Sequence, residues 1–167
     1  RIGTKDSTLV TFEELPEVIV DALVATEDSR FFQHNGLDLV RFLKASVLQV
    51  LGNNDAGGAS TLSMQVVKNT YTKKNQTETG SQSFIRKFKD IYISVFKLET
   101  NYTKQEIIEF YLNSQWFANT GNINVSDGLW GIERASQWYF GKSSKDLNLS
   151  EASLLVGMFQ NTRLYNP

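Results

Sequence analysis

Apolar residues at helical spacing run through most of this chain, and that periodicity restricts the fold more than any other sequence feature. Segments with this spacing occupy residues 14–32, 38–51, 59–71, 84–99, 103–113, 131–140 and 149–159. Thr103 and Glu106 form a capping-box signature at the start of one segment. No strand-like alternation of any length appears, although residues 7–13 suit a short strand or an extended lead-in. We therefore predict a mainly α-helical fold.

The composition excludes several classes of function. The 167 residues suit one domain or one and a half, and a hydrophobic fraction of 41% argues against global disorder. A net charge of −1 gives no whole-protein field that would attract nucleic acid. The chain has no cysteine and its only histidine is His34, so we expect no disulfide, no cysteine-based or multi-histidine metal site and no Ser-His-Asp triad. No apolar run reaches transmembrane length.

The middle of the chain is locally basic. Residues 60–90 carry six Lys or Arg against two Asp or Glu, a balance of about +4. The stretch "GGASTLSMQ" places a glycine-rich loop before Ser60 and Thr61, where free N–H groups at a helix start would favour an anion. Lys68 follows about two turns later on the same helix, and Arg86 comes further along. This cluster suits a phosphorylated leaving group, although a solvated basic face also explains the charge.

The stretch "ATEDSRFFQHNG" places two carboxylates at the end of an apolar helical segment. On a helical wheel, Glu27 lies at the flank of the apolar face and Asp28 points away from it. We expect Glu27 to be the more desolvated acid, an environment that strengthens a carboxylate as a base. Asp28 is expected to be structural near a helix end, and His34 to hydrogen-bond to the backbone.

The segment 38–51 carries a broad apolar arc opposite its basic residues. Core packing is the simpler account of this arc, and contact with a membrane interface is the alternative. The polar stretches at 52–58, 72–83 and 119–128 are predicted to be loops.

Five short motifs follow one another along the chain from about residue 13. They are Glu27-Asp28-x-x-Phe31-x-x-His34-x-Gly36, Gly58-x-Ser60-Thr61-Leu62-x-x-Gln65-x-x-Lys68-Asn69, Arg86-Lys87-x-x-Asp90, Lys104-x-x-Ile107-Ile108-Glu109-x-Tyr111-Leu112-Asn113, and residues 131–158 with a closing Tyr165-Asn166-Pro167. In order and spacing, these motifs resemble the glycosyltransferase domain of class A penicillin-binding proteins and monofunctional peptidoglycan glycosyltransferases (glycosyltransferase family 51).

The resemblance implies a single lysozyme-like glycosyltransferase domain over residues 1–167, with residues 1–12 as a lead-in. A larger globular lobe would accompany a smaller, mobile lobe on the membrane side, which includes about residues 38–83. The sequence reads as a segment of a longer chain. The resemblance therefore implies a membrane anchor outside this segment and a location on the extracytoplasmic face of the bacterial membrane. Parent proteins of this family often carry a transpeptidase domain as well.

The resemblance also implies a reaction. Such domains polymerise lipid II at the membrane surface, and the 4-hydroxyl of the acceptor GlcNAc attacks C1 of the growing glycan strand with inversion. Glu27 would be the general base, and Asp90, the second predicted catalytic residue, would assist or position groups at the donor side. The pyrophosphate and sugars would be bound by Lys68, Arg86, Ser60, Thr61, Gln65 and Lys87. Structural support would come from Asp28, Phe31, His34, Gly36, Glu109 and Asn113.

The resemblance implies no required cofactor, leaves room for a divalent cation, and predicts binding of moenomycin-type inhibitors. Two alternatives stay open. A lysozyme-like lytic hydrolase would use Glu27 as an acid but would not need the cations at Lys68 and Arg86. The second alternative is a catalytically silent module of the same fold. It stays open because Asp90 replaces the Glu that the family normally has, and Gln82 replaces the basic residue that is usual at that position.

Overall fold

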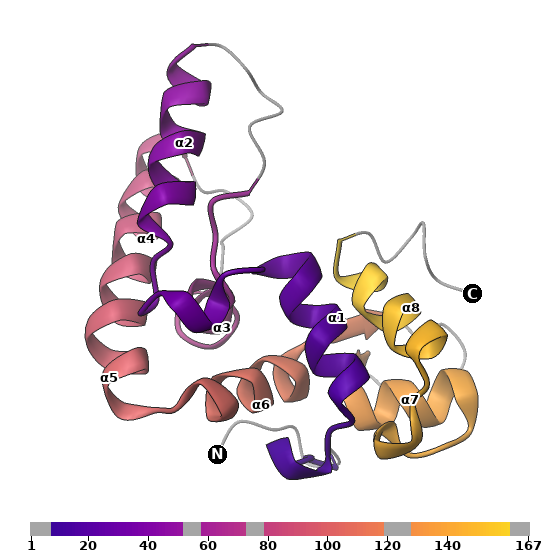
Figure 1. The fold of residues 1–167 in the computed structure, drawn as a ribbon. Coiled ribbons are helices and arrows are strands. Elements are labelled where there is room, and N and C mark those ends of the chain that lie inside the picture. Colours follow the sequence, from indigo (N-terminus) through magenta and orange to yellow (C-terminus); the bar gives the residue numbers. More distant parts are fainter. Residues whose placement is uncertain (1–7, 52–57, 73–78, 119–127, 161–167) are drawn as a thin grey trace. The chain divides into compact units, whose positions relative to one another are not determined.

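The computed structural model describes residues 8–51, 58–72, 79–118 and 128–160. It is mainly helical, which confirms the predicted fold class (Figure 1). The elements in chain order are η1 (Phe12–Glu14), α1 (Glu17–Glu27), η2 (Phe31–Gln33), α2 (Leu39–Val50), α3 (Leu62–Thr70), α4 (Gly80–Ile93), the π-helical η3 (Ser94–Leu98), α5 (Glu99–Asn101), α6 (Lys104–Ser114), β1 (Trp116–Ala118), β2 (Leu129–Trp130), α7 (Ile132–Phe140), η4 (Ser144–Asp146) and α8 (Leu149–Gln160).

Side-chain caps explain where several helices begin. The Thr61 hydroxyl accepts a hydrogen bond from the Met64 backbone N–H at the start of α3. The Thr103 and Glu106 pair closes the predicted capping box at the start of α6. Each cap satisfies backbone N–H groups that the first helical turn leaves without partners.

The chain divides into two compact units. The first contains the described residues up to Thr26 and from Ile108 onward, and the second runs from Glu27 to Ile107. The first unit has a core in which the rings of Tyr111 and Phe117 each pack edge-on against Phe159. β1 and β2 also belong to this unit and form a two-stranded antiparallel sheet, in which Trp116 lies opposite Trp130.

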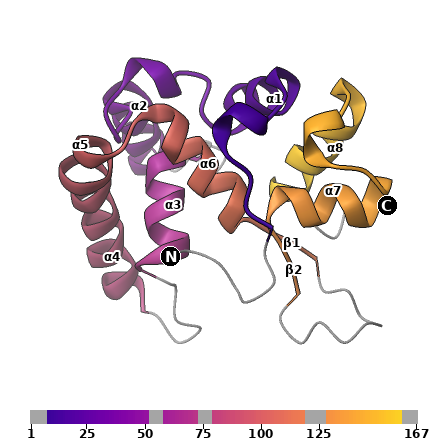
Figure 2. The ribbon, with the colours of Figure 1, turned by 90° about the horizontal axis from the view of Figure 1, so that it is seen from below.

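The second unit is built around α3, whose Leu62, Met64, Val66 and Val67 are buried. Figures 1 and 2 both show α3 alongside α4, and the two helices are in contact. The π-helical turn follows α4 directly, where the Ser94 hydroxyl donates a hydrogen bond to the Asp90 carbonyl within the helix.

Several sequence-based expectations for local structure are wrong. The helix expected over 14–32 ends at Glu27. Of the two alternatives for residues 7–13, the described residues 8–11 form no strand, and η1 begins at Phe12. The loop expected over 72–83 is helical from Gly80, because Thr79 and Gln82 cap α4. The sheet of β1 and β2 was not expected, since its strands are too short to show alternation. Residues 52–57, 73–78 and 119–127 of the predicted loops lie outside the described residues.

The apolar arc of α2 is not a core face. Leu39, Val40, Leu43 and Val47 are 54–63% exposed, so the expectation of core packing is wrong for these residues. α4 and η3 carry a comparable exposed set, Phe84, Ile85, Phe88, Tyr92 and Phe96. None of the helices in the described part of the chain combines the length and the apolar character needed to cross a bilayer.

Candidate active site

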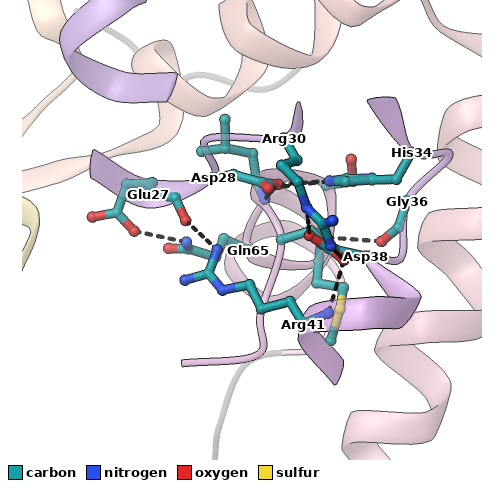
Figure 3. A network of polar contacts seen from close by, with 12 residues as sticks. Glu27, Asp28, Arg30, His34, Gly36, Asp38, Arg41 and Gln65 are labelled. Carbon is teal, nitrogen blue, oxygen red and sulfur yellow. Dashed lines mark hydrogen bonds and ion pairs between the residues drawn. The ribbon is translucent and has the colours of Figure 1, made fainter. Parts of the chain in front are cut away.

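Glu27 is the last residue of α1 and is half-buried. Gln65, on α3, donates a hydrogen bond from Nε2 to Glu27 Oε2 at 2.9 Å. Arg41, on α2, donates from Nη1 to the backbone carbonyl of Glu27 at 3.0 Å. Figure 3 shows the second carboxylate oxygen of Glu27 pointing away from these contacts. Gln65 thus holds the carboxylate through Oε2, and the other carboxylate oxygen points away from Gln65 and Arg41.

Asp28, rather than Glu27, is the more buried acid. Its side chain is 0% exposed, because the chain turns out of the helix after Glu27 and directs Asp28 into the second unit. The carboxylate contacts His34 Nε2 at 3.0 and 3.1 Å and accepts the Leu62 backbone N–H at 3.0 Å. The expected order of burial was therefore wrong, and so was the expectation that the His34 ring would bond to the backbone.

A bidentate ion pair lies at the start of α2. Arg30 donates from Nε to Asp38 Oδ2 at 2.8 Å and from Nη2 to the other carboxylate oxygen (Figure 3). Asp38 is 3% exposed and also accepts the Arg41 backbone N–H at 2.9 Å. The Arg30 hydrogen bond is the main reason that the pKa of Asp38 lies below its ordinary value, against the opposing effect of burial. The pair fixes the helix start next to Arg41.

Gly36 lies against the backbone of Ser94 and is hydrogen-bonded to the second motif. Its φ is +84°, a conformation that suits glycine, and an added Cβ would lie 2.9 Å from the Ser94 backbone carbon. The Gly36 carbonyl accepts the hydroxyl of Thr61 at 2.7 Å. Thr61 therefore links the glycine turn to the start of α3, and half-buried Ser60 precedes it.

Lys104 ties the fourth motif to the first. Its Nζ donates to the His34 carbonyl at 2.6 Å and to Glu99 Oε1 at 2.8 Å, and it lies 4.2 Å from the centre of the Phe31 ring. The Ser63 hydroxyl donates to the same Glu99 oxygen. This network gives a largely buried cation its partners and holds the turn after Glu27.

The third-motif acid lies in a second cluster. Asp90 is 4% exposed, accepts a hydrogen bond from the Thr72 hydroxyl, and pairs with Arg86 Nη1 at 3.1 Å. Arg86 borders a pocket of about 490 Å³ at the end of α3 and the start of α4. The lining residues are Thr70, Tyr71, Thr72, Gln82, Ile85, Arg86 and Lys89. Because Thr72 and Arg86 enclose the Asp90 carboxylate, its geometry favours a role in orienting Arg86 over direct contact with a substrate.

The remaining predicted site residues are two exposed lysines of the second unit and two side chains of the first unit. Lys68, in the last turn of α3, and Lys87, on α4, have exposed side chains. Glu109 and Asn113 belong to the first unit. Glu109 accepts the Phe12 backbone N–H at 3.2 Å, and Asn113 exchanges two hydrogen bonds with the Val10 backbone. These two side chains secure the lead-in.

Several participants were not predicted from sequence, among them Arg41, Asp38 and Glu99. Asp38 could have been found, because an Asp immediately before the first apolar residue of a helical segment is a helix-cap signal. Arg41 gave no such signal, since it looks like an ordinary charge on the polar face of a helix.

Comparison with known proteins covers the whole chain. The family model described as "Transglycosylase" matches residues 1–167. Penicillin-binding protein 1A of Streptococcus oralis is 36% identical over 166 residues, which is 99% of this chain and 24% of the relative. Penicillin-binding protein 1B of Haemophilus influenzae is 34% identical over 163 residues, or 98% of this chain and 20% of the relative. Penicillin-binding protein 1A/1B of Bacillus subtilis is 36% identical over 168 residues, or 100% of this chain and 17% of the relative. The chain thus spans a quarter or less of these relatives.

Proposed function

This chain belongs to the transglycosylase family, and from that premise we propose that it is the peptidoglycan glycosyltransferase domain of a class A penicillin-binding protein. The proposed substrates are lipid II and the growing glycan strand. A transpeptidase domain and a membrane anchor would belong to the rest of the protein, and the domain would work on the extracytoplasmic face of the membrane.

In the proposed reaction, the Glu27 carboxylate takes the proton of the acceptor 4-hydroxyl as that oxygen bonds to C1 of the donor sugar. The bond between C1 and the pyrophosphate oxygen breaks on the opposite face, and the lipid pyrophosphate leaves with the electron pair. The configuration at C1 therefore inverts. Lys68 and Arg86 would stabilise the charge that develops on the leaving group.

The observation that carries the proposal is the arrangement around Glu27. One carboxylate oxygen is fixed by Gln65, the backbone is fixed by Arg41, and the residue is only half-buried. This combination holds a base in one orientation and leaves it access to a substrate hydroxyl. The pocket beside Arg86 belongs to the same unit and offers cations for a phosphorylated group.

The proposed membrane contact draws on the exposed apolar residues of α2 and α4. A membrane-bound substrate requires that the domain rest against the lipid surface, and exposed apolar side chains with neighbouring lysines suit that surface. Lys87 and Lys89 are exposed on α4, the helix that also exposes Phe84 and Phe88.

The test is polymerisation of labelled lipid II in detergent by the wild type and by Glu27→Gln. We expect long glycan from the wild type and none from Glu27→Gln, because an amide cannot accept the hydroxyl proton. Glu17→Gln is the matched control, since Glu17 is an exposed carboxylate in the first turn of the same helix. Equal polymer from wild type and Glu27→Gln would refute the role of Glu27 as the base.

Two further measurements separate the alternatives. Cleavage of preformed glycan without any polymerisation would favour a lytic hydrolase. A folded wild type that binds moenomycin but makes no polymer would favour a silent module, and would turn attention to Asp90 and Gln82.

A further inference from the structure

Arg41 lies outside the five motifs, yet its side chain contacts Glu27, the proposed general base. Its Nη1 donates to the Glu27 carbonyl at 3.0 Å, across 14 residues of sequence. Glu27 is the last residue of α1, where carbonyl groups have no partner within the helix. A guanidinium is suited to this place, because it supplies both a hydrogen bond and a positive charge to the negative end of the helix dipole.

Arg41 acts from a fixed position. Its own backbone N–H donates to Asp38 Oδ1 at 2.9 Å, and Asp38 is held by the bidentate pair with Arg30. Asp38 is 3% exposed, so the anchor of this helix start is shielded from water. The base of the Arg41 side chain therefore has little freedom to shift.

Glu27 is consequently restrained at two separate points. Gln65 holds the carboxylate at 2.9 Å and Arg41 holds the main chain at 3.0 Å, and Figure 3 shows both contacts converging on Glu27. Gln65 restrains only the side chain of Glu27, whereas Arg41 restrains the peptide group at the end of the helix. A displacement of about 1 Å at a catalytic group can reduce the rate about 100-fold, so a backbone restraint matters here.

We propose that Arg41 is a positioning residue for the general base, and that it works through the backbone of Glu27 without touching the substrate. The inference rests on the proposed function, because it concerns the rate of that reaction. It also links Glu27 to α2, the helix that carries the exposed apolar residues Leu39, Val40, Leu43 and Val47.

The test compares Arg41→Ala and Arg41→Lys with the wild type in lipid II polymerisation, with separate measurement of kcat and KM. We expect Arg41→Ala to lower kcat about 10- to 100-fold and to change KM less than about twofold. Arg41→Lys should recover part of kcat, because the ammonium group can still donate to a carbonyl. Lys97→Ala is the charge-matched control, since Lys97 is exposed on η3.

A double-mutant cycle gives a second readout that a general loss of stability would not produce. Arg41→Ala and Gln65→Ala both release Glu27, so the double variant should lose less than the product of the two single losses in kcat. Lys97→Ala combined with Gln65→Ala should show independent effects.

Three outcomes would overturn the inference: a wild-type kcat in Arg41→Ala, a rise in KM at constant kcat, or independent effects of Arg41→Ala and Gln65→Ala. If Arg41→Ala does not fold, Arg41→Lys and Arg41→Gln decide the question, because each retains an N–H donor at different reach. A wild type that makes no polymer would overturn the proposed function as well. A normal wild type with an unaffected Arg41→Ala would overturn this inference alone.

Discussion

Replacing Asp28 should destabilise the protein more than any substitution on its exposed surface. The carboxylate is 0% exposed and accepts two hydrogen bonds, from the Leu62 backbone N–H at 3.0 Å and from His34 Nε2 at 3.0 Å. Because Nε2 faces a carboxylate, it carries the ring proton. Asp28→Ala leaves both donors buried without an acceptor, at about 1–3 kcal/mol each, or about 2–6 kcal/mol in total.

Asp28→Asn should cost less, and the structure gives the reason. The amide oxygen can still accept the Leu62 N–H, while the amide nitrogen would face His34 Nε2. The ring can accept that bond only by moving its proton to Nδ1, a buried atom that has no partner in the described structure. One unsatisfied donor remains, so we expect a loss of about 1–3 kcal/mol.

The assay is urea denaturation followed by circular dichroism, together with thermal unfolding. A domain of this size loses about 2–4 °C of Tm per kcal/mol, so the two variants should be clearly resolved. A cost below about 1 kcal/mol for Asp28→Ala would refute the reasoning. An Asn variant as damaging as the Ala variant would refute the argument about the His34 proton.

Three further predictions concern the same unit. Gly36→Ala should lower the free energy of unfolding by more than about 1–2 kcal/mol, because a φ of +84° strains alanine and the new Cβ would meet the Ser94 backbone. An unchanged free energy of unfolding would contradict this packing. Thr61→Val removes the cap of α3 and the donor to the Gly36 carbonyl, so unfolding should show a loss of about 1–3 kcal/mol, and none if the cap is dispensable. The pKa of Asp38 is lowered from 3.8 by Arg30, so the stabilisation is complete above that value and is lost as the pH falls through the lower folded-state pKa. Asp38→Asn should therefore flatten the acid side of the stability profile, and an unchanged profile would exclude this role.

The sequence was most informative where structure depends on neighbouring residues. The capping box of Thr103 and Glu106 spans three residues, and its hydrogen bonds form as predicted. The amphipathic helix expected at 38–51 is present as α2, although its apolar side is exposed. The five motifs were also sufficient to identify the family, because their order and spacing are properties of the sequence itself.

The sequence by itself thus determined the helical architecture and the family, whereas the tertiary structure decided how each side chain is used. Glu27 and Asp28 are adjacent, yet one is half-buried and the other fully enclosed, because α1 ends between them and Leu62 approaches from 34 residues away. The contact of Arg41 with the Glu27 carbonyl likewise depends on where α2 is anchored. Periodicity and caps arise from interactions within a turn of the chain, while burial and hydrogen-bond partners depend on segments that only folding brings together.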